Sequence, residues 1–112
     1  GCAMKMIDFT FGATNWPEVE QTEHPGETGV AYWRTRNFGE IRVRMVEYSA
    51  NYLADHWCDK GHILLILNGE FVLEFEDGGS ATLGPGQSYQ VAENARAHRV
   101  VTKGEAKVFI VD

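Results

Sequence analysis

The chain has 112 residues, with ten Lys and Arg against sixteen Asp and Glu, and a formal charge of −6. This length fits one domain, and the acidic balance argues against a general nucleic-acid-binding protein, which needs a basic surface. No stretch approaches the roughly 20 apolar residues of a membrane helix, and the N-terminus has no apolar signal region. Two cysteines, Cys2 and Cys58, do not make a disulfide framework, so we expect a cytoplasmic protein.

The N-terminal stretch is polar, and we expect residues 1–28 to pack on or pair with a barrel formed by residues 29–112. One helical turn is predicted over residues 16–20, with Asn15 as a possible cap and Pro17 at the first helical position. His24 follows in a polar segment, where an exposed loop histidine is one interpretation and a lid or accessory metal ligand is the other.

The remainder of the chain has the turn signals of an all-β protein. Gly, Asn, Asp and Pro separate short apolar or alternating runs, and no segment shows sustained helical periodicity. Asn68-Gly69 lies between two such runs and predicts a type I′ hairpin. Many short strands indicate a sandwich or barrel. The predicted strands are residues 30–35, 41–48, 62–67, 70–76, 87–91, 99–102 and 106–111.

Three side chains that bind metals in other proteins are close together in the sequence at His56, Cys58 and His62. On an extended strand His56 and Cys58 project to the same side. His62 follows a short polar break and is able to fold back towards them, and His98 stands at the start of a later strand. Imidazoles and a thiol that converge on one point are suitable ligands for a transition metal.

These residues resemble the motifs of the cupins, small jelly-roll β-barrels that commonly hold one metal. The first cupin motif runs Gly, five residues, His-x-His, three or four residues, Glu, six residues, Gly. Here His56-x-Cys58 is followed after three residues by His62 and after six more by Gly69, so Cys takes a His position and His takes the Glu position. In the second motif His98 comes one residue late after Gly86, without the usual Pro and Gly.

The resemblance spans roughly residues 40 to 112, and the tetrad at residues 55–58 looks like that of a poorly characterised bacterial group of single-domain cupins. It implies one divalent transition metal (Zn, Fe, Ni, Mn or Cu) held by His56, His62 and His98, with Cys58 as an optional fourth ligand. Thiolate ligation would make a closed, structural site. If Cys58 is instead a small buried hydrophobe, three imidazoles leave positions open for substrate or oxygen.

Other polar residues near this segment have two interpretations each. Arg42 and Arg44 alternate with apolar residues, so they share one face of a strand. Either this face is solvated, or one of the arginines points inward and holds a carboxylate or phosphate. The candidate catalytic groups are Tyr52, Glu47 and Arg44. Asp55 and Asp59 are candidates for hydrogen bonds to a ligand imidazole.

The function that we expect is that of a small metal-binding cupin, a non-haem oxygenase-like enzyme acting on a small organic molecule. Phe71, Leu73 and Phe75 are expected to line its cavity. One alternative is a non-catalytic small-molecule or metal-sensing module, and another is an isomerase or sugar-binding cupin. A homodimer is expected because an open barrel has edges and apolar faces to cover; neither nucleic acid nor membrane is an expected partner.

Overall fold

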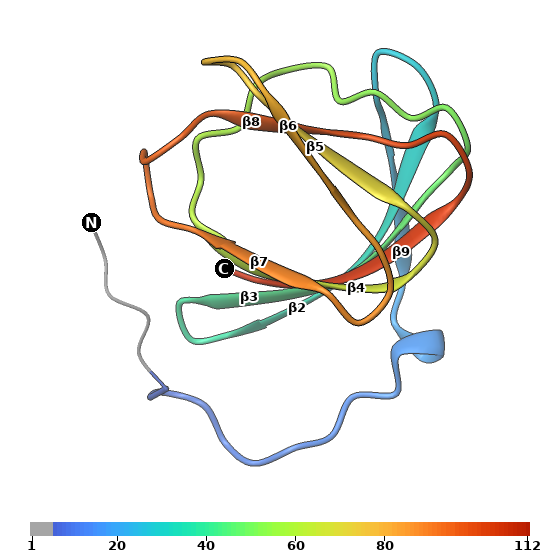
Figure 1. Cartoon of the computed structure of the whole chain (residues 1–112). Helices are drawn as coiled ribbons and strands as arrows, with labels where there is room; N and C mark the ends of the chain where they lie inside the picture. Colours follow the sequence, from blue (N-terminus) through green and yellow to red (C-terminus); the bar gives the residue numbers. More distant parts are fainter. Residues whose placement is uncertain (1–5) are drawn as a thin grey trace.

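The computed structural model describes residues 6–112, in which β-strands predominate (Figure 1). Nothing helical in that range reaches the length and hydrophobicity that a membrane-crossing helix requires. The elements are the 3₁₀-helix η1 (Trp16–Glu18) and the strands β1 (Gln21–Pro25), β2 (Val30–Phe38), β3 (Ile41–Tyr48), β4 (His62–Asn68), β5 (Phe71–Phe75), β6 (Ser80–Leu83), β7 (Ser88–Val91), β8 (His98–Val101) and β9 (Ala106–Val111).

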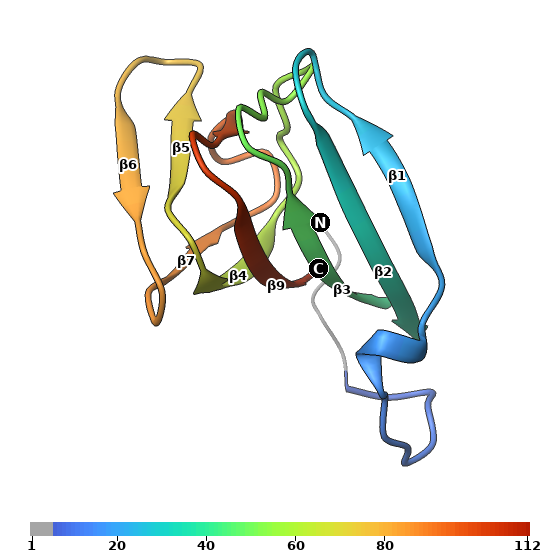
Figure 2. The same cartoon turned by 90° about the vertical axis from the view of Figure 1, so that its right-hand side faces the viewer.

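The strands form two antiparallel sheets that face each other (Figures 1 and 2). One sheet has six strands in the order β1-β2-β3-β9-β4-β7, and the other has three in the order β6-β5-β8. The predicted all-β jelly-roll fold is confirmed. In residues 6–112 the two sheets keep separate ladders of hydrogen bonds, so they do not close into a continuous barrel.

Strands β3 and β9 have the bounds that their apolar alternation predicts, whereas β1 and β6 are absent from the sequence prediction. Both of these strands are short, lie at sheet edges and carry mostly polar or exposed residues, so they have no buried face to produce a signal. The predicted turn at residues 16–20 is the 3₁₀-helix η1, and the Asn15 side chain makes no capping bond there.

The prediction of a hairpin at Asn68-Gly69 is wrong. β4 pairs with β7 and β9, while β5 pairs with β6 and β8, so this turn carries the chain from one sheet to the other. A type I′ turn needs positive φ at both central residues, and only Gly69 has it (φ 78°). Gly69 also lies against the backbone of Glu105, whose carbonyl oxygen leaves no room for a Cβ.

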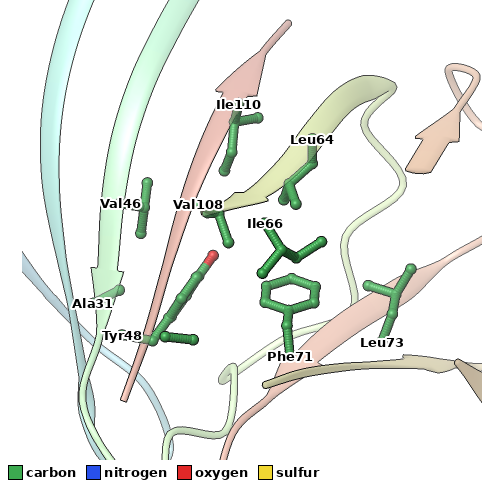
Figure 3. Packing of buried hydrophobic residues seen from close by; sticks show 10 residues of the cluster. Ala31, Val46, Tyr48, Leu64, Ile66, Phe71, Leu73, Val108 and Ile110 are labelled. Atoms are coloured by element: carbon green, nitrogen blue, oxygen red, sulfur yellow. The ribbon is translucent and has the colours of Figure 1, made fainter. Parts of the chain in front are cut away.

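The hydrophobic core lies between the two sheets and is built from alternate residues of β3, β4, β5 and β9 (Figure 3). Val46, Ile66, Phe71 and Val108 have no exposed surface at all, and each such side chain contributes about 1.5–3 kcal/mol by leaving water. Phe71 and Leu73 are packed inside this core. Phe75, the third residue expected to line a cavity, packs against the same core, and none of the three lines the cavity at the end of the six-stranded sheet.

Candidate functional site

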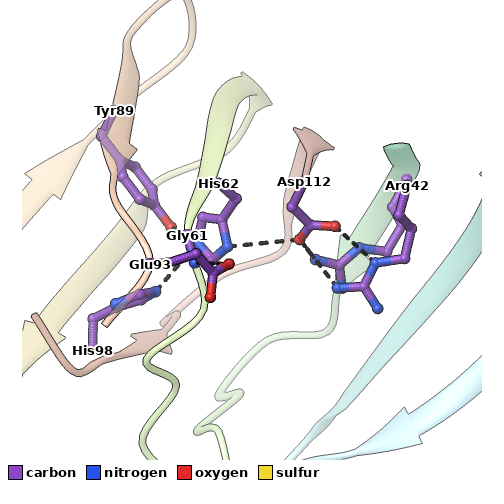
Figure 4. A network of polar contacts seen from close by, with 8 residues as sticks. Arg42, Gly61, His62, Tyr89, Glu93, His98 and Asp112 are labelled. Atoms are coloured by element: carbon purple, nitrogen blue, oxygen red, sulfur yellow. Dashed lines mark hydrogen bonds and ion pairs between the residues drawn. The ribbon is translucent and has the colours of Figure 1, made fainter. Parts of the chain in front are cut away.

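The first residues of β4 and β8 bring two imidazoles together between the sheets (Figure 4). His62 Nε2 and His98 Nε2 are 3.2 Å apart, and both side chains are buried. The hydroxyl of Tyr89, from the neighbouring strand β7, is 3.1 Å from the same His62 nitrogen. Groups from both sheets thus meet at the buried His62 Nε2, which has the His98 imidazole on one side and the Tyr89 hydroxyl on the other.

The outer nitrogen of each imidazole faces an oxygen that accepts hydrogen bonds. His98 Nδ1 is 2.8 Å from the carbonyl oxygen of Arg96, which only accepts, so this nitrogen carries the proton. His62 Nδ1 is 3.7 Å from Asp112 Oδ2 and makes no hydrogen bond, although it is buried. A protonated Nδ1 facing a carboxylate or carbonyl is the arrangement in which metal-binding histidines are usually held.

Asp112 links His62 to two arginines of β3. Its carboxylate, only 1% exposed, accepts from Arg42 Nε at 2.8 Å and Arg42 Nη2 at 3.0 Å, and from Arg44 Nη2 at 2.8 Å. Burial by itself raises the pKa of Asp112, but the hydrogen bond from Arg42 and the two guanidinium charges hold this pKa below its ordinary value. The carboxylate is therefore ionised at neutral pH.

Burial and the nearby His98 lower the pKa of His62 to about 4, so its imidazole is neutral at pH 7. Cys58 lies beside His98, and their side-chain interaction lowers the pKa of the thiol and raises the pKa of the imidazole. A thiol with a lowered pKa more readily becomes the thiolate that binds metals.

Cys58 and His56 have different environments because the chain bulges between them. Leu53 pairs with Val101 and Cys58 pairs with His98, so residues 54–57 lie opposite residues 99–100 and two residues are extra. In a regular ladder continuing from Leu53, His56 would stand opposite His98; the bulge puts Cys58 there instead. The His56 side chain is 75% exposed and its Nδ1 lies 2.6 Å from the Asp55 carboxylate.

The other predicted site residues are spread over the molecule. Arg44 is buried and bonded to Asp112, with its Nε lacking any partner. Tyr52 packs against Tyr48 in the core, and burial raises its pKa. Glu47 is half exposed on the outer face of β3, 3.7 Å from Lys107 Nζ. His24 belongs to strand β1 and its ring stacks on that of Trp33, with the ring centroids 3.8 Å apart, so it is not a free loop histidine.

The donor set fits a metal in part. The 3.2 Å between the two Nε2 atoms suits ligands of a single ion, because metal–imidazole bonds are about 2.0–2.1 Å long. The thiol of Cys58 is the third donor near them. Across residues 6–112, however, no three His, Cys, Asp or Glu side chains already converge on one point as a metal would require.

A cavity of about 510 Å³ opens beside this group at the end of the six-stranded sheet. Its wall combines apolar side chains with His62, Asp112 and a lysine, so a small organic ligand in it would reach the polar group. The lining includes Lys60, His62, Ile63, Val91, Val111 and Asp112.

Sequence reasoning missed Tyr89 and Asp112. Both belong to alternating strands, and their faces follow from register: Tyr89 stands opposite Leu64, and Asp112 continues the inward row of Val108 and Ile110. Extending the alternation of residues 106–111 by one position would have placed Asp112 inside. Neither residue belongs to the cupin motifs, so the motif comparison had no reason to select them.

No protein-family model and no curated protein matches the chain, but solved structures do. A predicted oxalate decarboxylase from Thermotoga maritima matches with a TM-score of 0.75 and 11% identity over 89% of this chain and 96% of that one. A cupin-superfamily sugar phosphate isomerase from Silicibacter pomeroyi gives 0.68 and 13% over 89% and 74%. A cupin-2 domain protein from Shewanella frigidimarina gives 0.59 and 18% over 71% and 78%.

The chain has the cupin fold. At these identities the likeness establishes the architecture of the domain and not its reaction. The predicted cupin resemblance is confirmed at the level of the fold. The narrower group suggested by the tetrad at residues 55–58 stays a prediction.

Proposed function

We propose that this cupin binds one divalent transition metal through His62, His98 and Cys58, with His56 as the further predicted ligand, and acts on a small organic molecule. The observation that carries the proposal is the 3.2 Å pair of Nε2 atoms whose outer nitrogens both face oxygen acceptors. If both imidazoles are neutral and carry their protons on Nδ1, the two Nε2 lone pairs face each other, and a cation between them would remove that repulsion.

Each surrounding side chain has a role in this proposal. The charge of Asp112, 3.7 Å from His62 Nδ1, favours the tautomer that carries the proton on that nitrogen, while Arg42 and Arg44 keep Asp112 ionised. Tyr89 donates its hydroxyl proton towards His62 Nε2, or to a ligand atom that takes the same place. The bound metal (Zn, Fe, Ni, Mn or Cu) supplies Lewis-acid or redox chemistry.

For the reaction we propose non-haem oxygenase-like chemistry in the 510 Å³ cavity beside His62. A second candidate, isomerase or sugar-binding chemistry without redox change, is favoured by the Tyr89 hydroxyl and the two imidazoles, which are suited to moving protons. A non-catalytic small-molecule or metal-sensing module is the third. Dependence on Fe or Mn together with oxygen consumption identifies the first of these; Zn with no oxygen consumption excludes it.

The test is elemental analysis of protein purified without a metal-affinity column. We expect about one metal per chain, lost in His62→Ala and His98→Ala and retained in the control His24→Ala, whose ring stacks on Trp33. Loss of the metal in Cys58→Ser would show that the sulfur is a ligand. Loss of the metal in His56→Ala would show that the bulge rearranges to bring His56 to the site. Absence of metal from the wild type, with a melting temperature unchanged by added metals, would refute metal binding.

Two broader expectations belong with this proposal. Cys58 is a free thiol, which suits a reducing cytoplasm. Two copies are expected to associate as a homodimer, since the six-stranded sheet has an open edge at β7 and apolar side chains on its outer face.

A further inference from the structure

The cavity beside His62 is walled mainly by aliphatic side chains from four neighbouring strands. β3, β9, β4 and β7 follow one another across the six-stranded sheet, and each contributes one of its ends to the cavity. Its volume of about 510 Å³ lies within the roughly 300–1,000 Å³ of small-molecule sites, which combine apolar walls with a few polar groups. A suitable ligand therefore has an apolar body. The apolar lining comes from Ile41, Ile63, Val91, Ala92 and Val111.

Lys60 is the only lysine or arginine among the described residues that line this cavity. It stands two residues before β4 and its side chain is exposed. Within residues 6–112, no ion pair involves its ammonium group. The nearby carboxylate of Asp112 already accepts three hydrogen bonds from two arginines (Figure 4). The Lys60 ammonium is therefore available to an anionic ligand.

Positive charges outnumber negative ones around Asp112. Burial raises the pKa of this carboxyl, whereas the charges of Arg42, Arg44 and Lys60 lower it, so three cations act on one carboxylate. The Arg44 side chain is only 7% exposed, and its buried Nε has no hydrogen-bond partner. Buried polar groups normally have one, so this guanidinium is not fully compensated. This end of the cavity favours an anion over a cation.

Two glutamates also line the cavity, and they lie on either side of Lys60. Glu40 precedes β3, which is two strands from β4 in the sheet, or about 10 Å at the usual strand spacing. Glu93 follows β7, the neighbour of β4, and its Oε1 accepts the Gly61 amide at 2.9 Å. Three cations against the carboxylates of Asp112 and Glu93 leave one positive charge near the middle of the cavity.

We propose that this cavity binds a small monocarboxylic acid: Lys60 holds its carboxylate, and Ile63 and Val111 contact its apolar body. A hydrogen bond between an ammonium and a carboxylate is charge-assisted and therefore stronger than one between neutral groups. His62 belongs to the same wall, so the bound acid lies beside the polar group of the site. The inference names the ligand class of that site and rests on the function proposed above.

The first test compares ligands of similar size and different charge on the full chain after removal of metal with EDTA. Dissociation constants of benzoate, benzamide and benzylamine are measured by ligand-observed NMR titration, with acetate as the carboxylate that lacks an apolar body. We expect benzoate to bind about tenfold more tightly than each of the other three. Benzamide or benzylamine binding as tightly as benzoate, or no benzoate binding at millimolar concentration, overturns the proposal.

The second test removes each recognition element in turn. In Lys60→Gln we expect benzoate to bind about tenfold more weakly, and no more tightly than benzamide. Lys107→Gln is the matched control, because its ammonium faces Glu47 at the other end of β9, and it should leave both affinities unchanged. Ile63→Ser, at a half-exposed position of the wall, should weaken benzoate and benzamide together and keep their ratio. An unchanged benzoate affinity in Lys60→Gln or in Ile63→Ser overturns the proposal.

Metal content separates this proposal from the function on which it rests. A protein that holds about one metal per chain and does not bind benzoate refutes only the ligand class. A protein that binds benzoate through Lys60 and never holds metal refutes only the metal-dependent function.

Discussion

His62 and His56 are six residues apart, yet one is built into the polar group of the site and the other is in water. His62 begins a strand that pairs on both sides, and its ring lies among Tyr89, His98 and Asp112. His56 lies in a bulge, 75% exposed, with its Nδ1 against the carboxylate of Asp55 next to it in the sequence. Residues that share a motif are therefore held with very different strength, and the neighbouring strands decide which of them are preorganised.

The largest difference between the two regions should appear when the same substitution is made in each. Asp112→Asn removes the charge that two arginines share, and leaving buried charges unpaired costs about 3–5 kcal/mol. We expect the free energy of unfolding, measured by urea denaturation of metal-free protein, to fall by that amount.

The matched control is Asp55→Asn, in the exposed pair with His56. A surface substitution of this kind changes stability by less than about 0.5 kcal/mol. Equal losses for the two variants would mean that the bulge is as tightly coupled to the fold as the buried group.

The same contrast explains how much the sequence could predict. Within regular strands the apolar pattern is reliable, and β3 and β9 have the predicted bounds. It also correctly placed Arg42 and Arg44 on one face, although the carboxylate that they hold belongs to Asp112, 68 and 70 residues further along the chain. Partners so distant are set by sheet topology, which local patterns do not encode.

Where the chain leaves regular geometry, the same rule failed. It assumed an unbroken strand through His56 and Cys58, whereas the bulge turns the first outward and puts the second beside His98. The hairpin at Asn68-Gly69 failed for a related reason, since a short turn between two apolar runs also fits a crossing between sheets. The first error concerns which residues form a regular strand, and the second concerns which strands pair.

An intermediate effect is expected from pH. The pKa of His62 is about 4 in the folded protein against about 6.5 unfolded, so the unfolded state takes up the proton first as pH falls. Stability present above pH 6.5 is lost between pH 6.5 and 4, by about 3 kcal/mol at 1.36 kcal/mol per unit. The raised pKa of His98 acts in the opposite sense, so the difference between wild type and variant is the quantity to measure.

In metal-free protein, His62→Gln should flatten the fall in stability over this range, and His56→Gln, at an exposed position, should leave it unchanged. Chemical denaturation at several pH values between 7 and 4 measures both. A wild-type slope that persists in His62→Gln would show that another group takes up the proton.

The smallest effect should distinguish how the bulge itself is held. Arg99 lies over the ring of Trp57 at 4.3 Å while it also binds Glu74. An exposed cation–π contact contributes about 0.5–1 kcal/mol, so Trp57→Ala should increase local opening about two- to fivefold. Hydrogen exchange of the Cys58 amide, which donates to the His98 carbonyl at 2.7 Å, reports this opening. The amide of Leu64 in β4 is the internal control, because its strand pairs on both sides; acceleration at both amides would mean that the bulge and the site open together as one unit.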